Sequence, residues 1–293
     1  MTENIHNKCI VCDSLKITDL KGFETHHLIK CRNCGFVFMK KIPGPDELKS
    51  LYNSYIYNQE TFLSPITVKR YHSLLDEFEK FRKTNKLLDI GCGVGYFLEI
   101  AKGRGWEVYG NEYSATAIDI CQKKGLIMKI GELNINDFEQ HHFDIITSFE
   151  VLEHLNNPAE YFKPVKHWLR KDGLFYCTTP NFNSLTRYYM KDRYDLIAYP
   201  EHLSYFTKKT LNKLMISQGF KLIKFRSTGF SLSRLKISKG KSDEKIHTTN
   251  SSDEIIRRNI EKKWYMFLAG KIINFLLNLT NTGMTLKGYY IKK

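Results

Sequence analysis

Four cysteines near the N-terminus are spaced like the ligands of one metal ion. Cys9 and Cys12 form a C-x2-C pair, Cys31 and Cys34 form a second, and eighteen residues separate the pairs. Each pair can give two thiolates to one ion, and four thiolates complete a closed tetrahedral zinc site. Because sulfur would fill all four positions, none is left for water, and we expect a structural rather than catalytic Zn²⁺.

A second group of informative residues follows a short apolar run, 87–90, which is typical of a buried parallel strand. The pattern D-x-G-x-G-x-G runs from Asp89 to Gly95, and its glycines let the backbone turn sharply and approach a ligand closely. The next predicted strand ends near Glu112, whose carboxylate could accept both hydroxyls of a ribose. Two flanking acids suit a ligand with an amino group and a sulfonium better than one with phosphates.

At these residues the chain resembles the class I S-adenosylmethionine-dependent methyltransferases, and the resemblance continues to about residue 225. It implies an α/β fold with a Rossmann-like seven-stranded sheet whose last strand is antiparallel, and S-adenosyl-L-methionine as the cofactor. It also implies that the loop containing Glu132 and Leu133 borders the adenine, with a plain surface turn as the alternative. The residues expected to bind the cofactor are Asp89, Gly91, Cys92, Gly93, Gly95, Glu112, Tyr113, Glu132, Leu133, Phe149 and Glu150.

Two histidines are the candidate catalytic residues. His154 follows the predicted strand 143–149, at the edge where ligands bind in such sheets, and a histidine can act as a general base near neutral pH. Its segment, V-L-E-H-L, resembles an element of small-molecule methyltransferases. His202 lies in P-E-H-L-S-Y-F-T, which resembles another element of the same enzymes. The alternative for His154 is a structural one, in which Glu153 and His154 cap the strand and hold the loop.

The elements that must position these residues follow from apolar periodicity and from glycine and proline. Strands are predicted at 87–90, 107–110, 126–130, 143–149, 174–179, 220–225 and 284–293, and helices at 66–84, 96–102, 115–124, 158–170, 208–218 and 264–279, with a long loop over 182–199. The predicted domains are a zinc ribbon (1–42), a helical connector covering the cofactor site (43–84), the cofactor-binding core (85–230), a mobile linker (231–258), and an amphipathic helix with the final strand (259–293).

The N-terminal motifs also indicate a class of acceptor. The two cysteine pairs, C-G-F-V-F, P-x-P and Y-x-x-Y resemble the amino-terminal region of zinc-bearing methyltransferases of sugar and surface-polysaccharide pathways, including sugar C-methyltransferases. This resemblance implies O- or C-methylation of a sugar or of a nucleotide-sugar or glycan intermediate. The N-[DP]-P-P-[YFW] signature is absent after the fourth predicted strand, which argues against N-methylation of DNA or protein glutamine.

The net charge of +14 leaves a second function open. A basic chain can bind polyanions, so the alternative is a ribosomal or transfer RNA methyltransferase that docks RNA through its zinc ribbon and basic surface. No block of six like charges and no arginine-rich stripe supports that alternative, and lysine scattered along the chain explains the charge equally well. A small-molecule acceptor is therefore preferred, and nothing in the sequence fixes the oligomeric state.

One apolar segment bears on location. Residues 264–279 are apolar at helical spacing, but Lys271 and Asn274 lie within them, and the segment is too short and too polar to span a bilayer. It is expected either to pack on the core or to lie on an anionic membrane surface. The first eight residues contain no apolar run of a secretory signal, so we expect a cytoplasmic protein, with peripheral attachment to the inner membrane face as the alternative.

Overall fold

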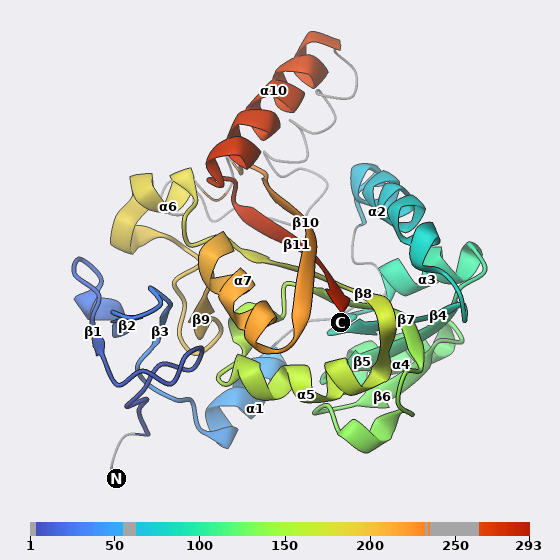
Figure 1. The fold of residues 1–293 in the computed structure, drawn as a ribbon, viewed down its shortest axis with the longest axis horizontal. Helices are drawn as coiled ribbons and strands as arrows, with labels where there is room; N and C mark the ends of the chain where they lie inside the picture. The colour runs from blue at the N-terminus through green and yellow to red at the C-terminus, as the bar shows by residue number, and fades with distance from the viewer. Residues whose placement is uncertain (1–3, 55–62, 232–233, 235–263) are drawn as a thin grey trace.

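The computed structural model describes residues 4–54, 63–231, 234 and 264–293 and contains two β-sheets (Figure 1). The larger sheet has seven strands in the order β10-β11-β8-β7-β4-β5-β6, in which β11 runs antiparallel to both of its neighbours. Its strands are β4 (Lys86–Ile90), β5 (Glu107–Glu112), β6 (Ile127–Ile130), β7 (Phe143–Phe149), β8 (Leu169–Pro180), β10 (Phe220–Thr228) and β11 (Thr285–Lys292). The predicted Rossmann-like fold is confirmed.

Helices cover both faces of this sheet because its central strands carry apolar side chains on both sides. On β4, Leu87 points toward α2, α3 and α4, whereas Leu88 points toward the opposite face, which α5 and α7 cover. The helices are α1 (Pro45–Ser54), α2 (Pro65–Phe78), α3 (Tyr96–Gly103), α4 (Ala115–Lys123), α5 (Pro158–Trp168), α6 (Leu185–Met190), α7 (Lys208–Ser217) and α10 (Trp264–Thr280). The ligand-binding edge of the sheet is therefore left between two helical layers.

The smaller sheet joins distant parts of the chain. It has the order β1-β2-β3-β9, and its strands are β1 (Ile17–Asp19), β2 (Leu28–Cys31), β3 (Val37–Met39) and β9 (Ser204–Tyr205). In the antiparallel β3–β9 pair, Val37 lies opposite Tyr205, and the Met39 N–H donates to the Leu203 carbonyl at 2.9 Å. The N-terminal sheet thus takes one of its strands from the segment that follows His202.

Three expected boundaries were wrong for identifiable reasons. The helix predicted over 158–170 ends at Trp168, because Leu169 pairs with Phe143 and starts β8 early. The helix predicted over 66–84 ends at Phe78 and continues as a 3₁₀ turn. The loop predicted over 182–199 contains α6, which the Ser184 hydroxyl caps by accepting the Arg187 N–H at 3.2 Å. The expected linker 231–258 lies outside the described residues apart from positions 231 and 234.

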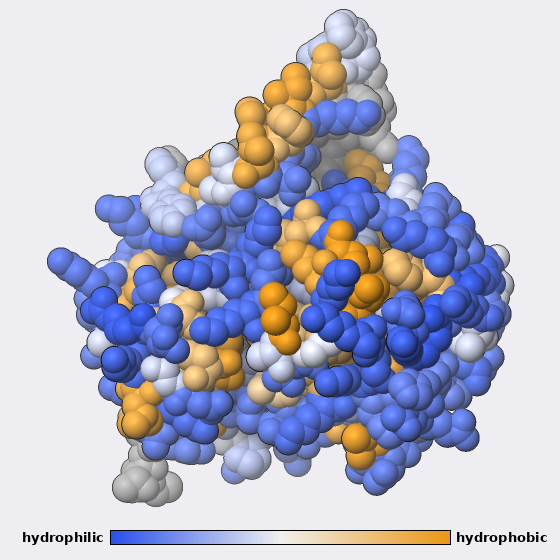
Figure 2. Space-filling view, viewed as in Figure 1, coloured by the Kyte–Doolittle hydropathy of each residue, from blue (hydrophilic) through white to orange (hydrophobic). Residues whose placement is uncertain are grey.

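Helix α10 projects from the body of the molecule (Figure 1). Two side-chain amides hold it on β10: Asn278 Oδ1 accepts the Ser227 N–H at 2.8 Å, and Asn274 Oδ1 accepts the Gly229 N–H at 3.0 Å. Leu277 is buried beside them. Large apolar side chains along the rest of the helix are exposed, and Figure 2 shows them as a continuous stripe. Of the helices that the structure describes, none has the length and apolar character that crossing a bilayer requires.

Candidate functional site

The glycine-rich loop after β4 has a backbone that other residues could not adopt without strain. Gly91 has φ +70°, and a Cβ placed there would lie 2.5 Å from a methyl of Val151. Gly95 has φ +78°, and a Cβ there would lie 2.6 Å from a methyl of Leu126. Glycine is the residue that combines this conformation with such close contacts. The loop can therefore bend tightly at the carboxyl end of β4 and expose its backbone to a ligand.

The carboxylate of Glu112, at the end of β5, is held by three backbone N–H groups. Gly93 donates to Oε2 at 2.9 Å, while Tyr113 and Ser114 donate to Oε1 at 2.7 and 3.1 Å. Each carboxylate oxygen has more than one acceptor site, so the group can also accept hydrogen bonds from a ligand. Because β5 lies parallel and next to β4, the acid lies against the glycine loop. The three N–H groups fix the orientation of the carboxylate and leave acceptor capacity on Oε2.

Asp89 provides a second acid near this loop, but it is buried inside the sheet. Its Oδ1 accepts the Thr147 hydroxyl at 2.7 Å. Burial raises the pKa of Asp89 to about 7, the Thr147 hydrogen bond opposes this rise, and the Glu112 carboxylate adds to it. A cationic ligand nearby would favour the ionised form of Asp89.

A cavity of about 390 Å³ opens at this edge of the sheet. Its lining residues come from the ends of β4, β5 and β7, from the loop after β6 and from α5: Ile90, Gly91, Asn111, Glu112, Tyr113, Gly131, Glu132, Leu133, Glu150, Val151, His154, Leu155, Asn157, Glu160, Tyr161 and Pro164. Seven of the expected site residues are in this set. The other expected residues, Asp89, Cys92, Gly93, Gly95, Phe149 and His202, do not line the cavity.

Phe149, which remains a predicted cofactor residue, does not line the cavity. Its ring packs in an aromatic cluster under α2, with the Phe97 ring centroid at 5.0 Å and the Tyr71 ring centroid at 5.9 Å. Glu150, the next residue, has φ +51°, a left-handed conformation that is uncommon outside glycine, and its side chain opens into the cavity. The chain thus reverses direction directly after β7, which separates these two neighbours.

The structure brings the two candidate histidines together. Their ring centroids lie 4.9 Å apart, edge to face. His154 Nδ1 lies 2.7 Å from the Glu201 carbonyl, and His202 Nδ1 lies 2.7 Å from the Leu196 carbonyl. Since a carbonyl only accepts, each Nδ1 carries the proton and each Nε2 keeps a lone pair. His154 lines the cavity, whereas His202 lies behind it.

Their surroundings keep both histidines neutral at pH 7. Burial lowers the pKa of His154, and burial together with repulsion from His154 lowers the pKa of His202 to about 4. Glu153 is buried beside them and accepts the Thr179 hydroxyl at 2.9 Å, while burial and the nearby Glu150 raise its pKa. A carboxylate oxygen of Glu153 and one ring nitrogen each of His154 and His202 lie within 4.8 Å of one another. Two neutral imidazoles thus lie side by side, of which His154 lines the cavity and His202 lies behind it.

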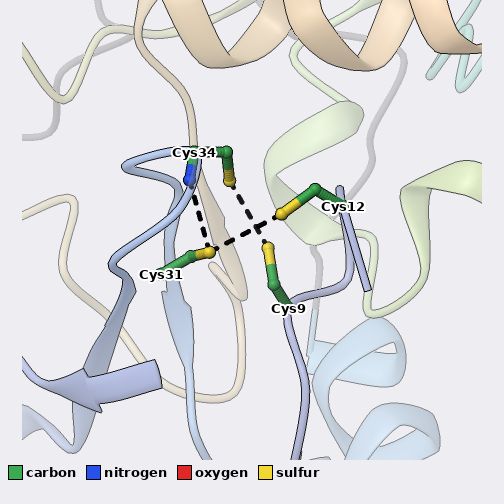
Figure 3. Close-up of side chains that lie close together, drawn as sticks. All are labelled: Cys9, Cys12, Cys31 and Cys34. Atoms are coloured by element: carbon green, nitrogen blue, oxygen red, sulfur yellow. Dashed lines mark hydrogen bonds between the residues drawn. The ribbon is translucent and has the colours of Figure 1, made fainter. Parts of the chain in front are cut away.

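The four N-terminal cysteines converge on one point (Figure 3). All four sulfur atoms lie within 4.8 Å of one another, with Sγ–Sγ distances of 3.5 Å for Cys9–Cys34 and 3.6 Å for Cys12–Cys31. Ligands at about 2.3 Å from a tetrahedral zinc would be about 3.8 Å apart, so the spacing suits that ion. The Cys34 N–H points at Cys31 Sγ from 3.4 Å.

Sequence reasoning missed several cavity residues on α5. Tyr161 faces the cavity, and its hydroxyl donates to Ser148 Oγ at 2.9 Å. Glu160 and Pro164 lie on the same helix. Pro164 follows Tyr161 by almost one helical turn, but Glu160 is its direct neighbour, so no helical periodicity in the sequence marks these residues as a common face.

Comparisons with known proteins agree with this geometry. The chain is 36% identical over 107 residues to a ubiquinone biosynthesis O-methyltransferase of Glaesserella parasuis serovar 5, an alignment covering 33% of this chain and 45% of that protein. A homologous enzyme of Actinobacillus pleuropneumoniae serotype 7 is 32% identical over the same length and is covered to 46%. The chain thus spans less than half the length of these relatives.

Solved structures show the same fold. A SAM-dependent methyltransferase from Archaeoglobus fulgidus superposes with a TM-score of 0.52 at 19% identity, covering 78% of this chain and 93% of that one. Phosphoethanolamine N-methyltransferase 2 of Haemonchus contortus, solved with S-adenosyl-L-methionine, gives a TM-score of 0.53 at 14% identity, covering 87% and 62%. Residues 62–224, more than half of the chain, match the family described as the methyltransferase domain. The chain belongs to this family and has the fold of the class I S-adenosylmethionine-dependent methyltransferases.

Proposed function

We propose that this protein transfers the methyl group of S-adenosylmethionine to a small-molecule acceptor. The observation that carries the proposal is the Glu112 carboxylate, which three backbone N–H groups hold beside the cavity. It would accept the ribose hydroxyls of the nucleoside. The loop at Glu132 and Leu133 would border the adenine. The Glu112 carboxylate at the cavity, with Asp89 buried in β4 behind it, suits the ammonium and sulfonium charges.

The chain's own residues would contribute alignment and a base. When bound, S-adenosylmethionine supplies an electrophilic methyl group on a sulfonium, whose departure leaves a neutral thioether. Little charge then needs to be stabilised, so the cavity acts mainly by aligning the reactants and excluding water. Where the acceptor must lose a proton, His154 Nε2 would take it, and His202 would orient the acceptor or serve as a second base.

A sugar-linked acceptor, methylated on oxygen or carbon, is the substrate class we favour. Its support is the resemblance of the N-terminal motifs to zinc-bearing methyltransferases of sugar pathways. This cysteine-bearing part adjoins the His202 segment, because β3 pairs directly with β9. The relatives named for ubiquinone biosynthesis are O-methyltransferases, which agrees with transfer to a hydroxyl group. RNA is the competing acceptor and belongs in the same assay.

We also infer that the four cysteines hold a structural Zn²⁺. The thiolates would close all four positions, so the ion would brace the fold and take no part in the reaction. The cysteines share a hydrophobic core with Phe36 and Phe38 of the small sheet and with Phe206, which follows β9. The metal would therefore support the segment that carries His202.

For α10 we infer contact with an anionic membrane surface. A stripe of large apolar side chains recurs every three or four residues, at Trp264, Leu268, Ile272, Phe275 and Leu279, and each is about half exposed or more. The two asparagine anchors turn this stripe away from the body of the molecule. The net charge of +14 favours a negatively charged bilayer, at which a cytoplasmic protein would be peripheral.

Replacing Glu112 by Ala should weaken binding of S-adenosylhomocysteine by roughly 10- to 150-fold, because about 1.5–3 kcal/mol of charge-assisted hydrogen bonding is lost. Isothermal titration calorimetry measures this. Glu107→Ala, at the exposed start of the same strand, is the matched control and should bind normally. Equal affinities for Glu112→Ala and wild type would remove Glu112 from the cofactor site.

Replacing His154 by Ala should lower turnover by about 10²–10⁴ while S-adenosylhomocysteine affinity stays within twofold. The assay follows tritium from the labelled methyl group into a panel of nucleoside-diphosphate sugars, with transfer and ribosomal RNA alongside. His202→Ala tests the second histidine, and His72→Gln, which is exposed on α2, is the control. Wild-type turnover in His154→Ala would exclude it as the base.

Removal of zinc should abolish turnover but have a smaller effect on the affinity for S-adenosylhomocysteine, because the metal would support the His202 segment rather than the ribose site. Atomic emission should give one equivalent of zinc in the purified protein and in Cys177→Ala, whose cysteine is buried outside the cluster. Cys31→Ser should lose the metal. Purified protein that contains no zinc and keeps its melting temperature with chelator would contradict the proposal.

The protein should float with phosphatidylglycerol vesicles in a density gradient at ~0.1 M salt and remain dense with phosphatidylcholine vesicles. Serine at Leu268, Ile272 and Phe275 together should abolish flotation, because the apolar stripe is lost. Serine at Ile130, Leu185 and Ile216, which are equally exposed elsewhere, should leave it intact. A wild-type protein that binds neither kind of vesicle but self-associates through the stripe would indicate that a second copy of the chain, and not a membrane, covers α10.

A further inference from the structure

Lys287, on β11, is a half-buried cation without a counter-ion. Across the part of the chain that the structure describes, no hydrogen bond or ion pair engages its ammonium group. Two other cations on β10 are paired: Lys224 and Arg226 both contact Glu77 of α2, at 2.5 and 3.1 Å. A desolvated charge without a partner disfavours the folded state. The arrangement therefore indicates that a bound ligand supplies the counter-ion of Lys287.

The strand register places Lys287 near Glu150, one of the residues that line the cavity. Lys287 lies opposite Thr178 on β8, and the Thr178 hydroxyl and carbonyl both accept the N–H of Glu150, at 3.2 and 3.0 Å. Glu150 lines the cavity. Side chains two residues apart on a strand share a face, and Tyr289 of β11 packs on Tyr176 under α2. Lys287 therefore stands on the α2 side of the sheet, near the carboxyl end of β8.

Charges of both signs surround this ammonium group, and the two cations act on it more strongly than the two acids. Arg70 of α2 and Arg226 of β10 repel it, and Glu150 and Glu77 attract it. Burial first, and then the two arginines, lower the pKa of Lys287 to about 8, so the group is still mainly charged at pH 7. Glu77 is already engaged by its two cations. An incoming anion would give Lys287 the ion pair that it lacks among the described residues.

We propose that Lys287 binds an anionic oxygen group, a carboxylate or a phosphate, of one of the two substrates. The naming of those substrates rests on the proposed function. One source is the methionine carboxylate of S-adenosylmethionine, and the other is an acidic group of the acceptor, such as the diphosphate of a nucleotide-linked sugar. A charge-assisted hydrogen bond to Lys287 would fix that group at the end of the cavity next to Glu150.

The test uses the full chain, Lys287→Met and the matched control Lys221→Met, which removes an exposed lysine from β10. Calorimetry measures three affinities at pH 7: for S-adenosylhomocysteine, for 5′-methylthioadenosine, which lacks the amino-acid part, and for inorganic pyrophosphate added to protein saturated with S-adenosylhomocysteine. Lys287→Met should weaken by at least tenfold either S-adenosylhomocysteine but not 5′-methylthioadenosine, or pyrophosphate. Lys221→Met should match wild type.

Each result has one meaning. If Lys287→Met loses affinity for S-adenosylhomocysteine alone, Lys287 binds the carboxylate of the cofactor. If it loses affinity for pyrophosphate, Lys287 binds the acidic group of the acceptor. Unchanged affinities for all three ligands, or an equal loss for 5′-methylthioadenosine, would overturn the proposal. If wild type binds pyrophosphate but neither nucleoside, the proposed function fails while the anion site stands.

Two further measurements would distinguish anion binding by Lys287 from a purely structural role. Since Lys287→Met removes a charge that has no partner, its melting temperature should equal or exceed that of wild type. Lys287→Arg should keep the anion affinity and lose less of it than wild type between pH 7 and 9, because a guanidinium stays charged while the lysine deprotonates near pH 8. A lower melting temperature for Lys287→Met together with wild-type pH behaviour in Lys287→Arg would contradict the assignment.

Discussion

The cleft depends on one carboxylate that the backbone holds from three directions. Glu112 accepts N–H groups from its own loop and from Gly93 of the neighbouring loop, so the carboxyl ends of β4 and β5 are linked through a single side chain. A group held in this way loses little further freedom when a ligand arrives. The tight bend at Gly91 and the buried acid Asp89 take their positions from the same pair of parallel strands.

Much of this arrangement could be predicted because its signals are local. The D-x-G-x-G-x-G string needs only its own backbone to form a bend. The spacing of the two C-x2-C pairs alone predicts a metal site with four thiolate ligands. The clustering of the four sulfurs is confirmed. Phe149 shares the α2 face of β7 with Ile145, as the two-residue alternation of a strand predicts, so its ring packs under α2 and it is Glu150 that lines the cavity.

The parts that could not be predicted depend on contacts between distant residues. Two residues, Ser204 and Tyr205, are too few for a periodic pattern, and their pairing with β3 is set by the tertiary fold. The contact between His154 and His202 follows from this pairing, because the Leu203 N–H donates to the Glu153 carbonyl at 2.7 Å. Lys287 was read only as part of a final strand, since its isolation depends on Arg70, Arg226 and Glu77 from two other elements.

Strand β9 is synthesised long after β3, the strand with which it pairs. Tyr205 leaves the ribosome 168 residues after Val37, its partner in the small sheet. At ordinary rates of synthesis this gap lasts on the order of ten seconds, during which β3 is an unpaired edge with apolar side chains. Early capture of a metal ion by the cysteines would keep this edge folded while it waits, but the edge would stay open to unwanted pairing with other nascent chains. The N-terminal sheet can thus be completed only after β4 to β8 have been synthesised, although before β10 and β11.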